Sequence, residues 1–151
     1  MTSTTLALES GYWNHVGHGV GAIVLYALIG LVLLLLGFQA IDSTTPGPLR
    51  KMIGTGNPNA VIIAAAGMVS MALIIVLAIY SAGGRLAEGL VATAIYGVVG
   101  IIVQVVAMRL LEMALGLRIG DLLKSPTYHV QALLVAAAHL SIGFVVAIAI
   151  L

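Results

Sequence analysis

The chain has 151 residues, of which 62% are hydrophobic and only 7% charged, and its mean hydropathy is +1.20. A soluble domain carries about 25% charged residues because its surface faces water, so this composition excludes a water-exposed globule. The net charge of +1 and the lack of a basic cluster argue against nucleic-acid binding. With no cysteine, the chain can form no disulfide, thiolate metal site or thiol nucleophile. Its length suits a single domain over residues 1–151.

Four uncharged, apolar stretches follow one another along the chain, at about residues 19–40, 59–80, 89–108 and 130–151. Each has the roughly 20 residues that a helix needs to cross a hydrocarbon core of about 30 Å. Helix is expected because an open strand would leave backbone groups unpaired in lipid. The sequence therefore predicts an all-α integral membrane four-helix bundle with short connections.

The residues around these stretches predict their orientation. Residues 1–18 carry Glu9 but no Lys or Arg and precede a long apolar run, which is atypical of a secretory signal peptide. Basic residues gather in the first and third connections, whereas the second has only Arg85; they are Arg50, Lys51, Arg109, Arg118 and Lys124. Because cytoplasmic loops are enriched in Lys and Arg, we expect both termini to be extracytoplasmic, in a bacterial plasma (inner) membrane.

The two halves of the chain resemble each other. Tyr26 and Gly30 in the first stretch correspond to Tyr96 and Gly100 in the third at one constant sequence offset. Asp42 and Glu112 keep that offset, and residues 64–67 match residues 136–139 at nearly the same one. Each half holds two spans, so the halves must share one orientation. This predicts two parallel two-span repeats, in contrast to the inverted repeats of many transporters.

The first and third connections have their own pattern. Leucines alternate with charged residues over residues 110–124, which favours an amphipathic helix at the membrane surface, although Gly116 and Gly120 weaken it. Pro126 is expected to end that segment before the fourth span. Residues 44–48 predict a turn, followed by a short segment from Leu49 to Ile53.

Polar and small residues follow one face of the third span. Its members recur at three- and four-residue steps: Thr93, Gly97, Gly100, Gln104 and Ala107. Such a face permits close helix approach and a hydrogen bond between helices. We interpret it as a helix-packing face, with a pore or transport path that Ser70 and His139 would also line as the alternative.

His139 stands near the middle of the fourth span, where a polar side chain is costly. It could be a haem or metal ligand or a proton relay, or a neutral histidine that hydrogen-bonds to Gln104, Ser70 or a backbone carbonyl. No second histidine lies at its depth, because His129 is at one end of the same span and His15 and His18 precede the first. A haem would need a ligand from another subunit or of another type.

His15 and His18 are three residues apart, so they share one helix face and could bind a metal ion with Glu9. Closed zinc sites use four protein ligands, so we favour a surface location with incidental metal affinity. Tyr12 and Trp13 beside them are typical of an interfacial aromatic belt. No carboxylate lies within any span, which argues against an ion-driven transporter.

The first connection and the start of the second span carry a recognisable pattern, made of Asp42, Thr45, Pro46, Leu49, Ile53, Asn57, Asn59, Ala60 and Gly67. It resembles the bacterial inner-membrane family called domain of unknown function 350, whose members have four spans in two similar halves. The second half departs from it, with His129 and Gln131 at the expected Asn-type start and His139 opposite Gly67. The resemblance implies fold and location, and no catalytic residues.

These observations predict a non-enzymatic integral membrane subunit that assembles with itself or docks another membrane protein, with Arg50, Lys51, Arg118 and Lys124 as the docking surface. No cofactor is expected. Two alternatives stay open: an oligomeric pore or carrier lined by Ser70, Gln104 and His139, and a redox or cofactor-binding subunit that uses His139.

Overall fold

The structure is a computed structural model that describes residues 11–45, 47–82 and 85–151. Glu9 and Pro46 lie outside the described residues. All regular elements in the described part are helices: α1 (Tyr12–Thr44), α2 (Leu49–Gly54), α3 (Pro58–Ser81), α4 (Leu86–Leu115), α5 (Ile119–Lys124) and α6 (Gln131–Ala149).

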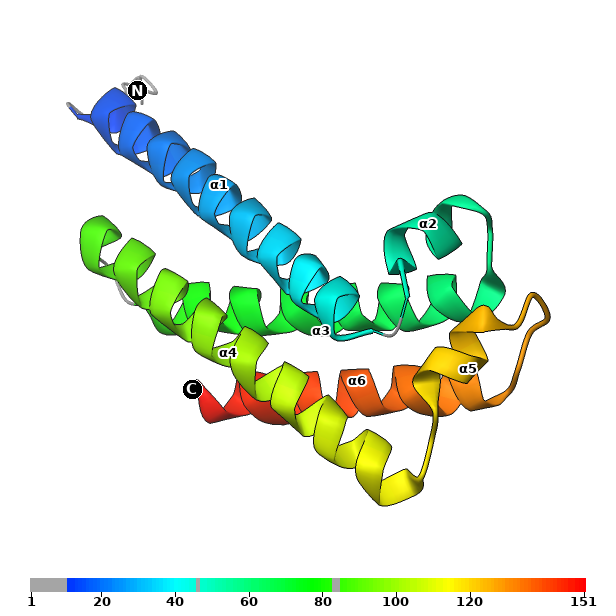
Figure 1. Cartoon of the computed structure of the whole chain (residues 1–151). Helices are drawn as coiled ribbons and strands as arrows, with labels where there is room; N and C mark the ends of the chain where they lie inside the picture. Colours follow the sequence, from blue (N-terminus) through cyan, green and yellow to red (C-terminus); the bar gives the residue numbers. More distant parts are fainter. Residues whose placement is uncertain (1–10, 46, 83–84) are drawn as a thin grey trace, which may run out of the picture.

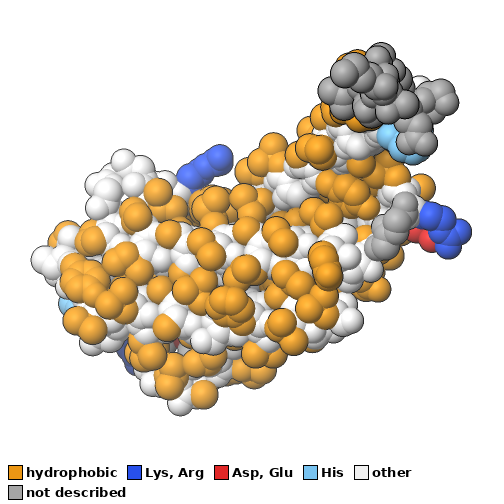
Figure 2. Space-filling model, turned by 180° about the vertical axis from the view of Figure 1, so that it is seen from behind, with side chains coloured by type: hydrophobic (Ala, Val, Ile, Leu, Met, Phe, Trp, Pro, Cys, Tyr) orange, Lys and Arg blue, Asp and Glu red, His pale blue; other side chains and the backbone are white. Residues whose placement is uncertain are grey.

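Four of these helices, α1, α3, α4 and α6, are long and apolar enough to cross a membrane. The all-α, four-span architecture is therefore confirmed. The surface agrees with it, because Figure 2 shows a face covered largely by hydrophobic side chains with few charged ones. Many large apolar side chains point outward, among them Leu28, Val76 and Val145. Such a surface is suited to lipid, since soluble monomers rarely expose contiguous apolar patches of this extent.

Two helices are longer than the sequence predicts. α1 begins at Tyr12 and has 33 residues, and α4 continues to Leu115 with 30 residues. At 1.5 Å per residue both are about 45–50 Å long, so they must tilt or project beyond the hydrocarbon core. The amphipathic helix expected over residues 110–124 is divided: Gly116 closes α4 in a left-handed conformation (φ +62°), and α5 then begins anew. That prediction of one surface helix was wrong because glycine readily takes this conformation.

The helices form two layers. α3 and α6 lie side by side in one layer, and α1 and α4 cross them in the other (Figure 1). The most extensive packing is between α3 and α6, and α1 also contacts α4. α3 packs against α4 as well, whereas α1 and α6 make no comparable contact in the described part of the chain. α3 is consequently the central helix.

The two halves, α1–α3 and α4–α6, have the same orientation, which confirms the parallel repeat. In Figure 1, the second half resembles the first half displaced sideways within the layers. A two-fold rotation would make the α3–α4 contact equivalent to an α6–α1 contact, and these differ. The repeat is therefore closer to a translation than to a two-fold axis.

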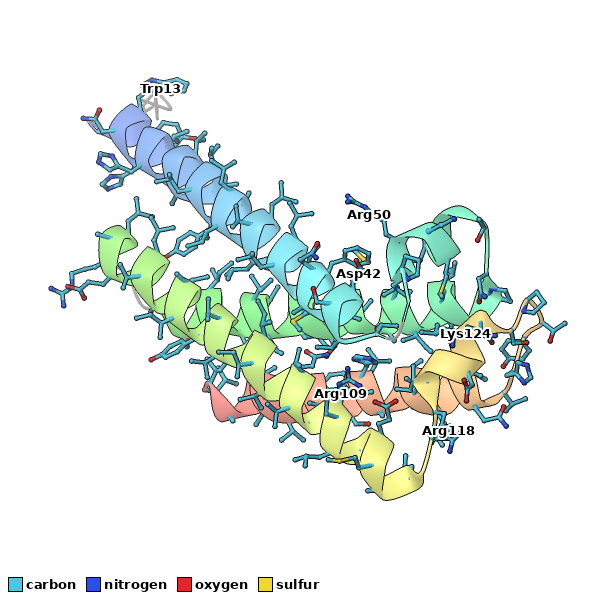
Figure 3. The ribbon with its side chains drawn as sticks, in the orientation of Figure 1. Trp13, Asp42, Arg50, Arg109, Arg118 and Lys124 are labelled. Carbon is cyan, nitrogen blue, oxygen red and sulfur yellow. The ribbon has the colours of Figure 1, made fainter. Side chains whose placement is uncertain are left out.

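The connections that hold α2 and α5 lie at one end of the bundle, opposite the start of α1 and the end of α6 (Figure 1). Arg50, Arg118 and Lys124 are at this end, and Trp13 is at the other (Figure 3). We call it the α2/α5 end. Arg85 lies before α4 at the opposite end, where it pairs with Glu88 at 2.8 Å. The basic connections thus share one end, and its assignment to the cytoplasm stays a prediction.

The apolar core consists of two clusters. One, near the α2/α5 end, includes Leu49, Ala60, Ile63, Leu123 and Val135. The other, nearer the chain ends, consists of Met71, Ile74, Val146 and Ala147. Three buried polar residues, Ser70 on α3, Gln104 on α4 and His139 on α6, lie between these two clusters along their helices.

Candidate functional site: a buried polar cluster and its crevice

Ser70, Gln104 and His139 meet in the core, contributed by α3, α4 and α6 respectively. Ser70 and Gln104 are fully buried, and His139 is 5% exposed. Gln104 Nε2 donates to Ser70 Oγ at 2.6 Å, and Ser70 Oγ donates to the His139 carbonyl oxygen at 2.8 Å. Gln104 Nε2 also lies 3.3 Å from His139 Nδ1. The three residues that sequence reasoning offered as pore-lining or cofactor-binding thus form one polar cluster.

Small residues bring these three helices together. A Cβ added to Gly143 on α6 would overlap Ser70 Oγ, so the glycine permits the close α3–α6 approach. A Cβ on Gly67 of α3 would lie 3.7 Å from His139 Nδ1. Gly67 and His139, which occupy equivalent positions in the two halves, therefore face each other. Close backbone approach of this kind is how membrane helices gain packing energy without a hydrophobic driving force.

The hydrogen-bond directions determine the state of each group. Because Ser70 uses its proton on the His139 carbonyl, it must accept from the Gln104 amide nitrogen. This choice of amide orientation follows from the network. His139 Nδ1 then faces a donor and acts as an acceptor, so the neutral ring carries its proton on Nε2. Within the described residues, Gln104 Oε1 is buried without a hydrogen-bond partner.

The small-residue face of α4 packs as a unit. Thr93, Gly97, Gly100 and Gln104 are all buried, and Ala107 is half-buried. Gly97 lies against Leu33 of α1, and Gly100 against Ile74 of α3. Thr93 Oγ1 is the second buried polar atom without a partner among the described residues. This face therefore serves helix packing along most of its length and supplies a polar group at Gln104.

A crevice connects the cluster to the α2/α5 end. It has a volume of about 40 Å³ and a wall formed by apolar residues such as Ile63, Val105 and Met108. Gln104 and His139 line its inner part, and Thr44, Thr45, Arg109 and Glu112 line the part nearer the helix ends. The polar cluster is thus reached from one side by a narrow, partly polar passage.

Arg109 holds the outer part of this crevice together. It lies on α4 beside the end of α1 (Figure 3) and donates through Nη2 to the Thr44 carbonyl oxygen. Its Nη1 is 3.0 Å from Glu112 Oε2. Glu112 Oε1 in turn accepts from the Ile119 backbone N–H at 3.3 Å. The Arg109–Glu112 pair therefore joins the last turns of α1 and α4 to the start of α5.

Two asparagines join the first connection to the third. Asn57 caps α3 by accepting from the N–H groups of Asn59 and Ala60, and its Nδ2 donates to the carbonyl oxygens of Leu123 and Ser125 at 2.8 and 2.9 Å. Asn59 is fully buried. It donates to the Thr127 carbonyl at 2.8 Å and accepts from the His129 N–H at 2.8 Å. The segment around Asn57 and Asn59, which carries the family pattern, thus joins the two halves of the chain by hydrogen bonds.

His15 and His18 lie at the other end of the molecule, on the exposed first turns of α1. His18 Nδ1 is 2.7 Å from the Asn14 carbonyl oxygen in its own helix. The described residues contain no group of three or more His, Asp or Glu side chains that could hold a metal ion. Beside His139, the crevice of about 40 Å³ is far too narrow for a porphyrin. Within one chain the arrangement therefore does not fit a haem, and we propose none.

Sequence reasoning missed the contacts of Arg109, Asn57 and Asn59. It treated Arg109 only as an orientation signal, and the asparagines only as a pattern at a helix start. An Asn-Pro-Asn run before an apolar helix signals a helix cap. Its partners more than 60 residues away lie outside what a single sequence can indicate.

Comparison with known proteins agrees with this geometry. The family model described as Domain of Unknown Function (DUF350) matches residues 15–150. A UPF0719 transmembrane protein of Mycolicibacterium paratuberculosis is 34% identical over 96% of this chain and 98% of its own length. UPF0719 transmembrane proteins of Mycobacterium bovis and Mycobacterium tuberculosis are each 38% identical over 88% of both chains. No solved structure matches. The resemblance seen in the sequence is confirmed: the chain is a multi-pass transmembrane protein that belongs to the DUF350 family.

Proposed function

We propose that this protein is a non-enzymatic subunit of the bacterial inner membrane that assembles with itself, head to tail. One observation carries the proposal. The two surfaces that form the α1–α4 contact inside the chain are repeated on the outside of the molecule, one on α4 and one on α1, and neither is covered there by another helix of the described residues. The internal repeat makes α1 and α4 equivalent helices.

The internal contact is specific in shape. The Tyr26 ring of α1 fits against Gly89 of α4, where a Cβ would overlap the tyrosine hydroxyl. One step further along, the Leu33 side chain fits against Gly97, where a Cβ would lie 2.5 Å from Leu33 Cδ1. The α1–α4 interface therefore consists of large side chains of α1 set into glycines of α4.

On α4, the residues equivalent to Tyr26 and Leu33 are Tyr96 and Val103, and each is 41% exposed. They line a groove of about 400 Å³ between α4 and α6, together with apolar residues such as Val145 and Val146. The large side chains that α1 uses for its contact are thus presented again, without a neighbour, by α4.

On α1, the residues equivalent to Gly89 and Gly97 are Gly19 and Ala27, and both are exposed. A Cβ added to Gly19 would meet no atom within 4 Å. In the most apolar window of α1 only 6% of the residues are buried, compared with 50% for α3. The small-residue half of the contact is therefore also presented to the outside.

The translation-like relation between the halves determines the kind of assembly. Two equivalent halves related by a two-fold axis would satisfy each other within one chain, whereas a translation leaves one unpaired face at each side. A second copy that placed its Gly19 on Tyr96 and its Ala27 on Val103 would continue the repeat. Such heterologous contacts produce a ring or an open row of subunits. In lipid, small residues that allow close packing supply the energy for this contact.

Disulfide cross-linking tests the proposal directly, because the natural chain has no cysteine. The double variant Ala27→Cys with Val103→Cys should form a ladder of dimers, trimers and larger species in membranes under mild oxidation, because the equivalent internal pair, Gly97 and Leu33, packs closely. Each copy then carries one cysteine for each neighbour. A disulfide requires Cα atoms about 4.4–6.8 Å apart, so ladder formation reports the proposed register.

The two single variants and a mismatched pair are the controls. Ala27→Cys alone and Val103→Cys alone should remain monomeric, and so should Ala27→Cys with Val106→Cys, since Val106 is exposed but lies outside the groove. Dimers from either single variant would indicate a two-fold interface and contradict the head-to-tail arrangement. A single-subunit mass in nanodiscs, measured without cross-linking, would contradict self-assembly itself.

Docking of another membrane protein is the second route for a subunit of this kind, and the exposed basic residues of the α2/α5 end would serve it. The carrier or pore alternative rests on the crevice that reaches Gln104. Solute flux into proteoliposomes separates it from a subunit role: flux that is lost in Gln104→Leu supports the carrier, and its absence from the wild type supports the subunit.

A further inference from the structure

We infer that the crevice at the α2/α5 end is a water-filled, one-sided inlet, in which the Gln104 side-chain carbonyl and His139 bind small protic molecules, water in the first place. This site is separate from the faces proposed for assembly, so it stands or falls independently of them. Four observations carry the inference.

The first is the unpartnered acceptor. Gln104 is fully buried and lines the crevice, and its Oε1 has no hydrogen-bond partner among the described residues. A buried carbonyl without a donor costs about 1–3 kcal/mol, so native structures almost always satisfy it with protein or water. The other end of the same amide is already used by Ser70. The site therefore calls for a ligand that donates a hydrogen bond.

The second observation is the matching donor. Because Gln104 Nε2 faces His139 Nδ1, the neutral His139 ring carries its proton on Nε2. Gln104 thus supplies an acceptor and the neutral His139 ring a donor, and both residues line the crevice. Water and other small hydroxyl or ammonium compounds can use such a pair, whereas an apolar gas cannot.

The third observation is size. The crevice has a volume of about 40 Å³, while one water needs about 10–15 Å³ by the same measure. A short file of water molecules fits, and an amino acid or nucleotide does not. Thr44, Thr45 and Glu112 supply further polar groups along the outer part, so the file would have partners beyond its innermost molecule.

The fourth observation is that the inlet is closed at depth. Ser70 is packed directly against Gly143, and beyond it Ile74 is packed against Gly100. The apolar cluster of Met71, Ile74, Val146 and Ala147 follows. One chain therefore provides access from the α2/α5 side only, and a continuous pore through it is disfavoured.

Silver ion is a suitable probe, because it is small, hydrated and reactive toward thiols. Val105→Cys and Ile63→Cys place a thiol on two walls of the crevice, from α4 and α3. Val106→Cys is the matched control, one residue further on α4 and 52% exposed on the outer surface. Protein in nanodiscs is treated with Ag⁺, and the remaining thiols are then counted with a fluorescent maleimide in SDS.

Both crevice cysteines should react at least about tenfold faster than the control, since a dry apolar surface excludes hydrated ions. Equal rates for all three would overturn the inference. Two crevice variants on different helices are used so that misfolding of one does not decide the result, and circular dichroism of each variant reports its folding.

The role of Gln104 and the sidedness are tested on the same background. Adding Gln104→Leu to Val105→Cys should slow the silver reaction severalfold, because leucine at the inner end of the crevice offers water no hydrogen bond. An unchanged rate would contradict binding at Gln104. In sealed vesicles, Ag⁺ should reach Val105→Cys from the face on which Arg118→Cys is labelled. Reaction from the Trp13 face would contradict a one-sided inlet.

Discussion

Gln104 on α4 donates a 2.6 Å hydrogen bond to Ser70 on α3, between two apolar clusters of the core. This bond ties the second half of the chain to the first at the depth where α6 also joins, through the His139 carbonyl. The polar cluster is therefore both a point of helix contact and the inner limit of the crevice. Its energetic weight can be separated from that of the surrounding packing.

We expect Gln104→Leu to change the free energy of unfolding by less than about 1 kcal/mol, because a hydrogen bond between membrane helices is worth on average about 0.6 kcal/mol. The substitution also removes the unpartnered Oε1. Thermal or SDS-induced unfolding in mild detergent measures the change. A loss above about 3 kcal/mol, the cost of a strongly destabilising core change, would show that the cluster is a principal source of stability.

The packing of Gly143 should matter more than that hydrogen bond. Gly143→Ala places a methyl group on Ser70, so we expect a loss of about 1–3 kcal/mol from overpacking. Gly21→Ala is the matched control, because a Cβ there meets no atom within 4 Å and alanine favours helix by about 1 kcal/mol. The same unfolding assay compares both variants. Equal stability of the two would contradict the close α3–α6 approach.

The hydrogen bonds that join the first connection to the third are tested at Asn59. Asn59→Ala removes the hydrogen bonds that this fully buried side chain makes with the Thr127 carbonyl and the His129 N–H, and each such bond contributes about 0.5–1.5 kcal/mol. We expect a clearly lower unfolding midpoint, measured by circular dichroism in detergent. Asn14→Ala serves as the control, since Asn14 is exposed on α1. If both variants melted alike, the first and third connections would not be joined as described.

The orientation can be read from two positions that lie at opposite ends, Trp13 and Arg118 (Figure 3). In intact cells, an impermeant maleimide should label Trp13→Cys, and Arg118→Cys only after permeabilisation. The reason is the excess of basic residues at the α2/α5 end, which favours the cytoplasm. Labelling of Arg118→Cys in intact cells would place the termini inside and reverse the predicted topology.

Much of the architecture follows from the sequence alone. Four apolar stretches of about 20 residues require four membrane helices, because lipid offers no partner to an unpaired backbone group. The paired tyrosines Tyr26 and Tyr96, with Gly30 and Gly100, indicated the repeat, and an even number of spans per half required it to be parallel. Helix ends were less predictable: α4 runs past its apolar part to Leu115, because nothing before Gly116 interrupts it.

Only the tertiary structure decided how these elements meet. That Ser70, Gln104 and His139 form one cluster depends on the relative rotation and depth of three helices, to which hydropathy is insensitive. The same holds for the Asn59 contacts with the third connection and for Arg109 at the end of α1. The translation-like relation between the two halves also became known only from the tertiary structure. Sequence similarity establishes that two segments are equivalent, whereas the symmetry that relates them is set by how their side chains pack.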